Sequence, residues 1–143
     1  MEMYVEGLRI YCHRGWPNRE WEGFRIAIFD FEGGVPGEML WPENGVPKWV
    51  RPELGSFEGW CDFRVLCVPR DTTFIAAWEQ FYDLPNCDAA SFDTGAWRGD
   101  HTWYRQNGDW KRWEGTNLML RVRVASGGAV TPVSLGRVKA LYR

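Results

Sequence analysis

The feature that most constrains the fold is an alternation of apolar and charged side chains along residues 60–67. Asp62 and Arg64 fall on one side of an extended chain. The other side holds two cysteines and two large apolar residues, Cys61, Phe63, Val65 and Cys67. A period of two is that of a β-strand with one buried face. Residues 73–82 are rich in β-branched and aromatic side chains, and Pro69 and Asp71 supply turn residues between the two stretches. We therefore predict that residues 60–82 form a hairpin at the centre of a sheet.

Shorter stretches with strand-like patterns recur along the rest of the chain. They are residues 4–12, 24–30, 39–41, 48–51, 101–106, 110–113 and 117–124. An Asn107-Gly108 pair between two of them is typical of a tight hairpin turn. No segment shows a helical period longer than about two turns. Many short strands with turn residues between them predict an all-β fold, an antiparallel β-sandwich of the jelly-roll or Ig-like type.

Length and charge limit the classes of protein to which the chain can belong. Its 143 residues suffice for one domain with a substantial core. A formal net charge of −2 gives no electrostatic reason to expect nucleic acid or an anionic membrane as partner. No apolar run approaches the roughly 18 residues that a membrane-spanning helix needs. The first residues lack the layout of a signal peptide, so we expect a mature, excised or cytosolic form.

The composition changes after residue 124. We predict a sandwich domain over residues 1–124, a Gly-rich linker over 125–133 and a C-terminal tail over 134–143. The tail carries a renewed apolar pattern at Leu135, Val138, Leu141 and Tyr142. Since a sheet edge can accept an added strand, we predict that the tail docks on a neighbouring subunit. The alternatives are a tail folded back on its own domain or a disordered one.

Four cysteines raise the question of disulfides. Along one strand, Cys61 and Cys67 would lie roughly 20 Å apart at ~3.3 Å per residue, too far for a bond that needs Cα atoms about 4.4–6.8 Å apart. The pairings that remain are Cys12–Cys61 with Cys67–Cys87, or Cys12–Cys67 with Cys61–Cys87. We predict two disulfides, which would place the protein outside the cytoplasm. Reduced core cysteines are the alternative. A zinc site is disfavoured because no C-x-x-C spacing is present.

Ten tryptophans make exposed aromatic side chains unavoidable in a domain of this size. The last predicted hairpin gathers a candidate binding surface of Trp97, Trp103, Tyr104, Trp110 and Trp113. Such rings can stack on sugars, or they can pack on one another across strands. Carboxylates such as Glu79 and those of residues 83–100 follow no catalytic or calcium-binding spacing. The sequence thus predicts no catalytic residue, no metal and no cofactor.

Several stretches together resemble a known class of module. Residues 24–30 followed by Gly34-Val-Pro-Gly37, then Gly59-Trp60 with residues 73–80, and finally residues 117–122 are similar to the strands of β-sandwich modules near the C-termini of secreted bacterial proteins. The ending, residues 135–143, resembles the short basic C-terminal tail found on such proteins, where it would serve sorting. The resemblance covers roughly residues 5–124 and implies a sandwich fold and an extracellular or cell-surface setting.

These observations predict a non-enzymatic extracellular β-sandwich that acts by protein–protein interaction. Its expected partners are copies of itself in a filament or surface layer, or a neighbouring extracellular domain. The alternative is a carbohydrate-binding module that uses its exposed Trp and Tyr side chains. The two hypotheses differ in whether the exposed rings meet protein or line an open groove for a glycan.

Overall fold

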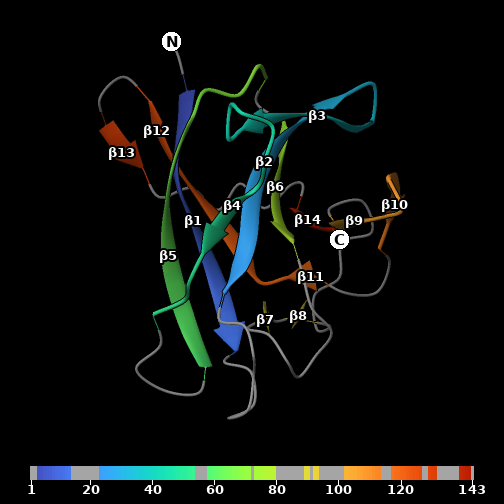
Figure 1. The fold of residues 1–143 in the computed structure, drawn as a ribbon. Helices are drawn as coiled ribbons and strands as arrows, with labels where there is room; N and C mark the ends of the chain where they lie inside the picture. Colours follow the sequence, from blue (N-terminus) through green and yellow to red (C-terminus); the bar gives the residue numbers. More distant parts are fainter. Residues whose placement is uncertain are drawn as a thin grey trace.

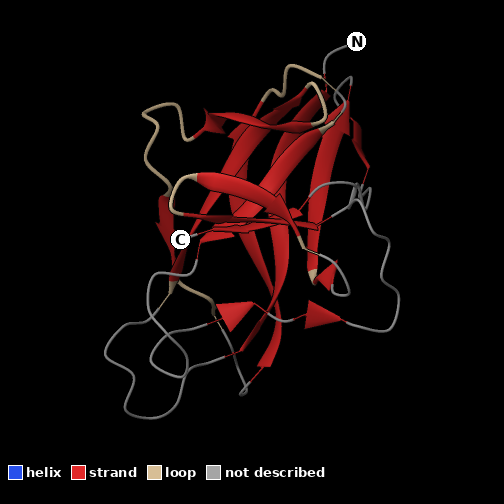
Figure 2. Cartoon of the chain, turned by 90° about the vertical axis from the view of Figure 1, so that its right-hand side faces the viewer, coloured by secondary structure: helices blue, strands red, loops and turns tan. Residues whose placement is uncertain are grey.

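The computed structural model describes most of the predicted strands. The residues it describes are 3–13, 23–53, 58–71, 73–79, 89–90, 92–93, 102–113, 117–126, 129–131 and 139–142. Within these ranges the chain consists of strands, turns and loops, with no helix (Figure 2). The prediction of an all-β fold is therefore confirmed, and its strands pair antiparallel except in the two ladders of β14.

Sheet A contains the alternation described above. Its strands, in spatial order, are β13 (Ala129–Thr131), β12 (Leu120–Ser126), β1 (Met3–His13) and β5 (Glu58–Cys67), and β7 (Ala89–Ala90) pairs with the end of β1. All of these ladders are antiparallel. β5, drawn in green, runs along one side of the molecule (Figure 1). Among the described strands only β1 pairs with it, so β5 ends the sheet.

Sheet B is built from strands that are distant in the sequence. Their spatial order is β10 (Asp109–Arg112), β9 (Thr102–Gln106), β14 (Lys139–Tyr142), β6 (Phe74–Glu79), β2 (Phe24–Glu32) and β3 (Val35–Trp41), with β4 (Lys48–Val50) also on β2. β14 is parallel to both of its neighbours, whereas the other ladders are antiparallel. Two further short strands, β11 (Asn117–Leu118) and β8 (Phe92–Asp93), pair with each other.

One apolar cluster, here called the central core, joins the two sheets. It takes side chains from β1, β5 and β12 of sheet A and from β2 and β6 of sheet B. Phe24 of sheet B contacts Phe63 of sheet A with ring centroids 5.4 Å apart, and it also contacts Trp78 at 5.9 Å. The alternation in β5 is confirmed, because its four predicted inward residues are buried and Asp62 and Arg64 are exposed.

A second apolar group, the outer cluster, covers the opposite face of sheet B. It consists of Ala27, Phe29, Ile75, Ala77 and Trp103, with Phe31, Met39 and Trp110 packed against it. The β9–β10 hairpin supplies its two tryptophans, and the tight turn between these strands has positive φ at Asn107 (53°) and Gly108 (86°). This confirms the predicted Asn-Gly turn. β2 and β6 are consequently buried on both faces.

The predicted hairpin of residues 60–82 is wrong. Both strands exist, as β5 and β6, but they lie in different sheets. The connection between them carries the chain across the core, so that Cys67 and Phe74 enter the same cluster from opposite sides. The predicted central position is correct for β6, which lies between β14 and β2, and wrong for β5. Turn residues show where a chain changes direction but not whether the flanking strands pair.

The buried face of β5 gives a test of the core with a matched control. We expect Val65→Ala to lower the free energy of unfolding by about 1.5–3 kcal/mol, because it removes two buried methyl groups and leaves a cavity. Val68→Ala makes the same change at a site that is 56% exposed, and it should stay within about 0.5 kcal/mol of wild type. Urea unfolding of the two variants is the measurement. Equal midpoints would contradict the burial of Val65.

Candidate interaction surfaces

The outer edge of β5 is the first candidate surface, and the register of the sheet shows which residues face it. Tyr11 lies opposite Trp60, yet the Tyr11 backbone N–H donates to Met119 O at 2.9 Å, on the β12 side of β1. In an antiparallel pair the hydrogen-bonding direction alternates residue by residue. Phe63 O accordingly faces β1, lying 3.1 Å from the position that a Cβ on Gly7 would take. Trp60, Asp62 and Arg64 therefore present their backbone groups to the outer edge.

The side chains on the outer face of sheet A form an aromatic and arginine cluster around Trp60. The guanidinium carbon of Arg121 lies 4.5 Å from the Trp60 ring centroid, and that of Arg9 lies 5.7 Å from it. Tyr11 contacts the same indole edge to face, with centroids 5.3 Å apart. Three adjacent strands thus contribute side chains that contact one ring.

Two polar contacts extend this cluster along the sheet. Arg9 Nε lies 3.6 Å from Asp62 Oδ1, and His13 Nδ1 lies 3.2 Å from Glu58 Oε2. Desolvation and the Glu58 carboxylate, which accepts a hydrogen bond from the phenol, raise the pKa of Tyr11. Arg64, by contrast, has no acidic partner among the described residues. Its exposed guanidinium lies in the middle of an edge strand and can bind a carboxylate from outside.

Exposed apolar side chains mark the end of the same strand. Leu66 is 75% exposed and Val68 is 56% exposed, the two highest values for large apolar residues in the described chain. Sequence reasoning missed this surface, because it placed β5 at the centre of a sheet. A signal was nevertheless present: the outward side of β5 reads Asp62, Arg64, Leu66, and charges on the solvent side are typical of an edge strand.

The predicted aromatic surface is not an open platform in the structure. Trp103 is buried in the outer cluster, with the Arg112 guanidinium 5.6 Å from its ring centroid. Trp110 is half-buried, packs edge to face on Phe29 at 5.2 Å and has Arg105 at 5.7 Å. Tyr104 and Trp113 are also half-buried and contact each other at 5.8 Å. Trp97 lies outside the described residues. The rings that the structure describes thus pack on one another and on arginines.

The tail contributes a strand to its own chain. Leu141 and Tyr142 belong to β14, which pairs with β6 on one side and β9 on the other. This is the folded-back arrangement, the alternative to docking of this segment on a neighbouring subunit. The physical reason is that β6 and β9 leave one strand position between them, which β14 fills. Leu135 and Val138 lie outside the described residues. The range predicted as a linker includes the end of β12 and the whole of β13.

The three cysteines that the structure describes are thiols, so the predicted bond from Cys12 to Cys61 or Cys67 is not formed in it. Cys12, Cys61 and Cys67 are all buried. Cys67 lies opposite Val5, which places it about 23 Å along β1 from Cys12 at ~3.3 Å per residue. Cys12 lies opposite Gly59, and Cys61 lies opposite Ile10. Such diagonal positions are about 7–8 Å apart, beyond the reach of a disulfide. Cys87 lies outside the described residues.

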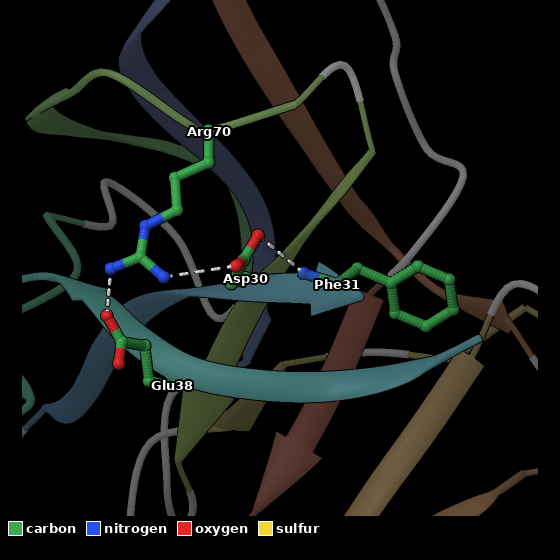
Figure 3. Close-up of polar contacts among 4 residues, drawn as sticks. All are labelled: Asp30, Phe31, Glu38 and Arg70. Carbon is green, nitrogen blue, oxygen red and sulfur yellow. Dashed lines mark hydrogen bonds and ion pairs between the residues drawn. The ribbon is translucent and has the colours of Figure 1, made fainter. Parts of the chain in front are cut away.

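A buried aspartate anchors the connection between the sheets. Asp30 accepts the Phe31 backbone N–H at 3.0 Å, and its other oxygen lies 3.4 Å from Arg70 Nη1 (Figure 3). Arg70 also donates to Glu38, and this hydrogen bond and the Glu38 charge raise the pKa of Arg70. Arg70 lies in the crossing between β5 and β6, so the group fastens that crossing to β2 and β3. One guanidinium thus bridges two carboxylates on neighbouring strands, which indicates a structural role.

The acidic residues considered for catalysis form no reactive pair in the described chain. Glu79 is buried on β6 and accepts a hydrogen bond from Arg25 Nη2 at 2.8 Å, across the ladder to β2. Asp83, Asp88 and Asp100 lie outside the described residues, and Asp93 is described only as part of β8. Among the side chains that are described, no group of three or more His, Cys, Asp or Glu residues is arranged to hold a metal ion.

The described residues contain no helix long and apolar enough to cross a membrane. Comparison with models of known protein families, with curated proteins and with solved structures finds no match to this chain.

The environment of Cys67 predicts a pH dependence of stability. Desolvation and the charge of Glu43 raise the pKa of its thiol from about 9 to about 11. Since the folded state keeps this proton when the unfolded state has released it, stability should fall as the pH rises from about 9 to about 11. The Cys67→Ala variant lacks this contribution. The difference in the free energy of unfolding between wild type and variant should therefore become smaller at high pH. Urea unfolding at several pH values is the measurement.

Alkylation provides the matching chemical control. At neutral pH the folded chain should leave Cys67 unmodified, whereas the unfolded chain should react without prior reduction. A requirement for reductant would show that the sulfur is oxidised.

Arg70 contacts one buried carboxylate, Asp30, and one exposed carboxylate, Glu38, and this difference gives a further prediction. Asp30→Asn should lower the free energy of unfolding by roughly 1–3 kcal/mol, because a buried acceptor loses its charge-assisted partner. Glu38→Gln makes the same chemical change at the exposed partner of Arg70, and its cost should be about 0–1 kcal/mol. Thermal unfolding monitored by circular dichroism compares the two. A larger effect at Glu38 would contradict the anchoring role of Asp30.

Proposed function

We propose that the two sheets form an antiparallel β-sandwich that acts as a non-enzymatic interaction module and associates with copies of itself through the outer edge of β5. The proposed sandwich is supported by the central core, to which the inner faces of both sheets contribute. The observation that carries the proposed association is the edge itself: a ten-residue strand that pairs with β1 alone among the described strands. Edge strands of this length readily accept another strand.

The side chains along the strand support the same function. Leu66 and Val68 are highly exposed at the end of β5. Burying an exposed leucine stabilises an interface by about 1.5–3 kcal/mol. The backbone groups of Trp60, Asp62 and Arg64 face outward, so an incoming strand would find hydrogen-bond partners at alternate positions. Association by strand addition would satisfy both the apolar and the polar groups of this edge.

The sugar-binding alternative has less support. A ring that stacks on a pyranose needs an open face. The rings of Trp60, Trp103 and Trp110 each have an arginine over one face, and Trp41 has Lys48 Nζ 5.8 Å from its centroid. The proposed extracellular or cell-surface setting rests on the resemblance of the strand and Gly-x-Pro-Gly motifs to modules of secreted bacterial proteins.

The proposed function predicts concentration-dependent association that depends on the β5 edge. Leu66→Lys should weaken self-association at least about tenfold, because it places a charge where an apolar side chain would be buried. Sedimentation velocity over a concentration series is the measurement. Val35→Lys is the matched control, since Val35 is 53% exposed but begins β3 of the other sheet. A wild-type chain that stays monomeric throughout the series would contradict the proposal.

A further inference from the structure

We infer that two copies of the chain pair β5 to β5 around a two-fold axis at Phe63, with Asp62 of each copy opposite Arg64 of the other. The inference rests on the proposed function and adds its geometry. The result is a closed, symmetric dimer in which sheet A continues from one copy into the next. A head-to-tail filament of the kind expected for a docked tail would have a different geometry.

The backbone of β5 suits this arrangement. Cys61 and Phe63 direct their N–H and C=O groups to β1, and Asp62 and Arg64 direct theirs outward, as the Tyr11–Met119 hydrogen bond and the position of Phe63 O require. With Phe63 on the axis, Asp62 faces the partner's Arg64 as a hydrogen-bonded pair. The two-fold repeats this pair on the other side. Both copies thus use the same backbone groups, as a two-fold interface demands.

In this register the charges on β5 of one copy are complementary to those on β5 of the other. Arg64 has no acidic partner among the described residues, and Asp62 is held by Arg9 on the neighbouring strand at 3.6 Å. The partner's Asp62 gives Arg64 a carboxylate directly across the ladder. Opposite charges in directly opposed positions stabilise a strand pair, whereas like charges destabilise it.

The same register covers the most exposed apolar side chain. Trp60 is the residue nearest the partner's Leu66 in this register. Leu66 is 75% exposed in the single chain and lies in the bulge that β5 forms between Arg64 and Cys67. The Trp60 side chain is already fixed by Tyr11, Arg9 and Arg121, so little side-chain freedom is lost when a leucine packs beside it. Each dimer buries two such leucines.

Neighbouring registers are excluded by the same criteria. A slip that centres the axis on Asp62 puts two Asp62 carboxylates directly opposite each other. A slip that centres it on Cys61 pairs Trp60 with Asp62 and leaves Leu66 beyond the end of the partner strand. A shift by a single residue would place the core-facing residues of one strand opposite the solvent-facing residues of the other. The Phe63-centred register alone pairs both charges and covers Leu66.

The test reverses one charge at a time and then mixes the variants. Asp62→Arg gives an edge with two arginines, and Arg64→Asp gives one with two aspartates. Each variant alone should dimerise at least about tenfold more weakly than wild type. Mixed in equal amounts they should form a one-to-one heterodimer, and the double variant D62R/R64D should dimerise like wild type. Sedimentation velocity measures all four, and circular dichroism verifies that each variant is folded. Lys111→Ala, which removes an exposed charge on β10 of sheet B, should leave the dimer intact.

The outcomes separate this inference from the function on which it rests. If wild type is monomeric, the proposed function fails and the dimer with it. If wild type dimerises and Leu66→Lys disrupts it, but the charge variants behave like wild type, the edge is used in another register and the inference is overturned. If a reversed charge unfolds the chain, Asp62→Asn and Arg64→Gln replace the pair. Each should weaken the dimer, and their mixture should restore it in part, because the heterodimer keeps one Asp62–Arg64 pair.

Discussion

The fold depends on the burial of β2 and β6 on both faces. One face of these strands meets sheet A in the central core, and the other meets the β9–β10 hairpin in the outer cluster. Only apolar or charge-compensated side chains are compatible with such a position. The residues obey this: β6 is buried along its whole length, and its Glu79 is paired with Arg25 of β2. Sheet A and the hairpin are each positioned by what they bury against this pair of strands.

The period-two pattern made the strands themselves predictable, since it is a local property of the sequence. β1, β2, β5, β9, β10 and β12 lie close to where alternation or turn residues placed them. Their pairing was not predictable in the same way, because it depends on residues that are far apart. The run Phe74-Ile-Ala-Ala-Trp78 has no alternation, and this is the sign of a strand covered on both sides. Interpreted in this way, it would have separated β6 from the one-sided β5.

The candidate surface was predictable only in part. Cysteines and tryptophans attracted attention because they are chemically distinctive, yet most of those described here serve the interior or pack on arginines. The residues that carry the proposed association are ordinary ones, Asp62, Arg64 and Leu66. Their significance comes from the position of β5 at the end of sheet A, and strand order is a non-local property. The identity of a side chain therefore says little until the edge on which it lies is known.

The parallel strand β14 has a consequence for how the protein is made. It is the strand that links β6 to β9 in sheet B, and its residues are translated after both of its neighbours. During synthesis, the β2–β6 ladder and the β9–β10 hairpin can each form as they emerge, but they cannot be joined through the sheet until residues 139–142 have been added. A long interval between neighbouring strands slows folding and leaves strand edges exposed in the meantime. Until residues 139–142 emerge, the nascent chain would therefore have an unfilled strand position between β6 and β9 in sheet B.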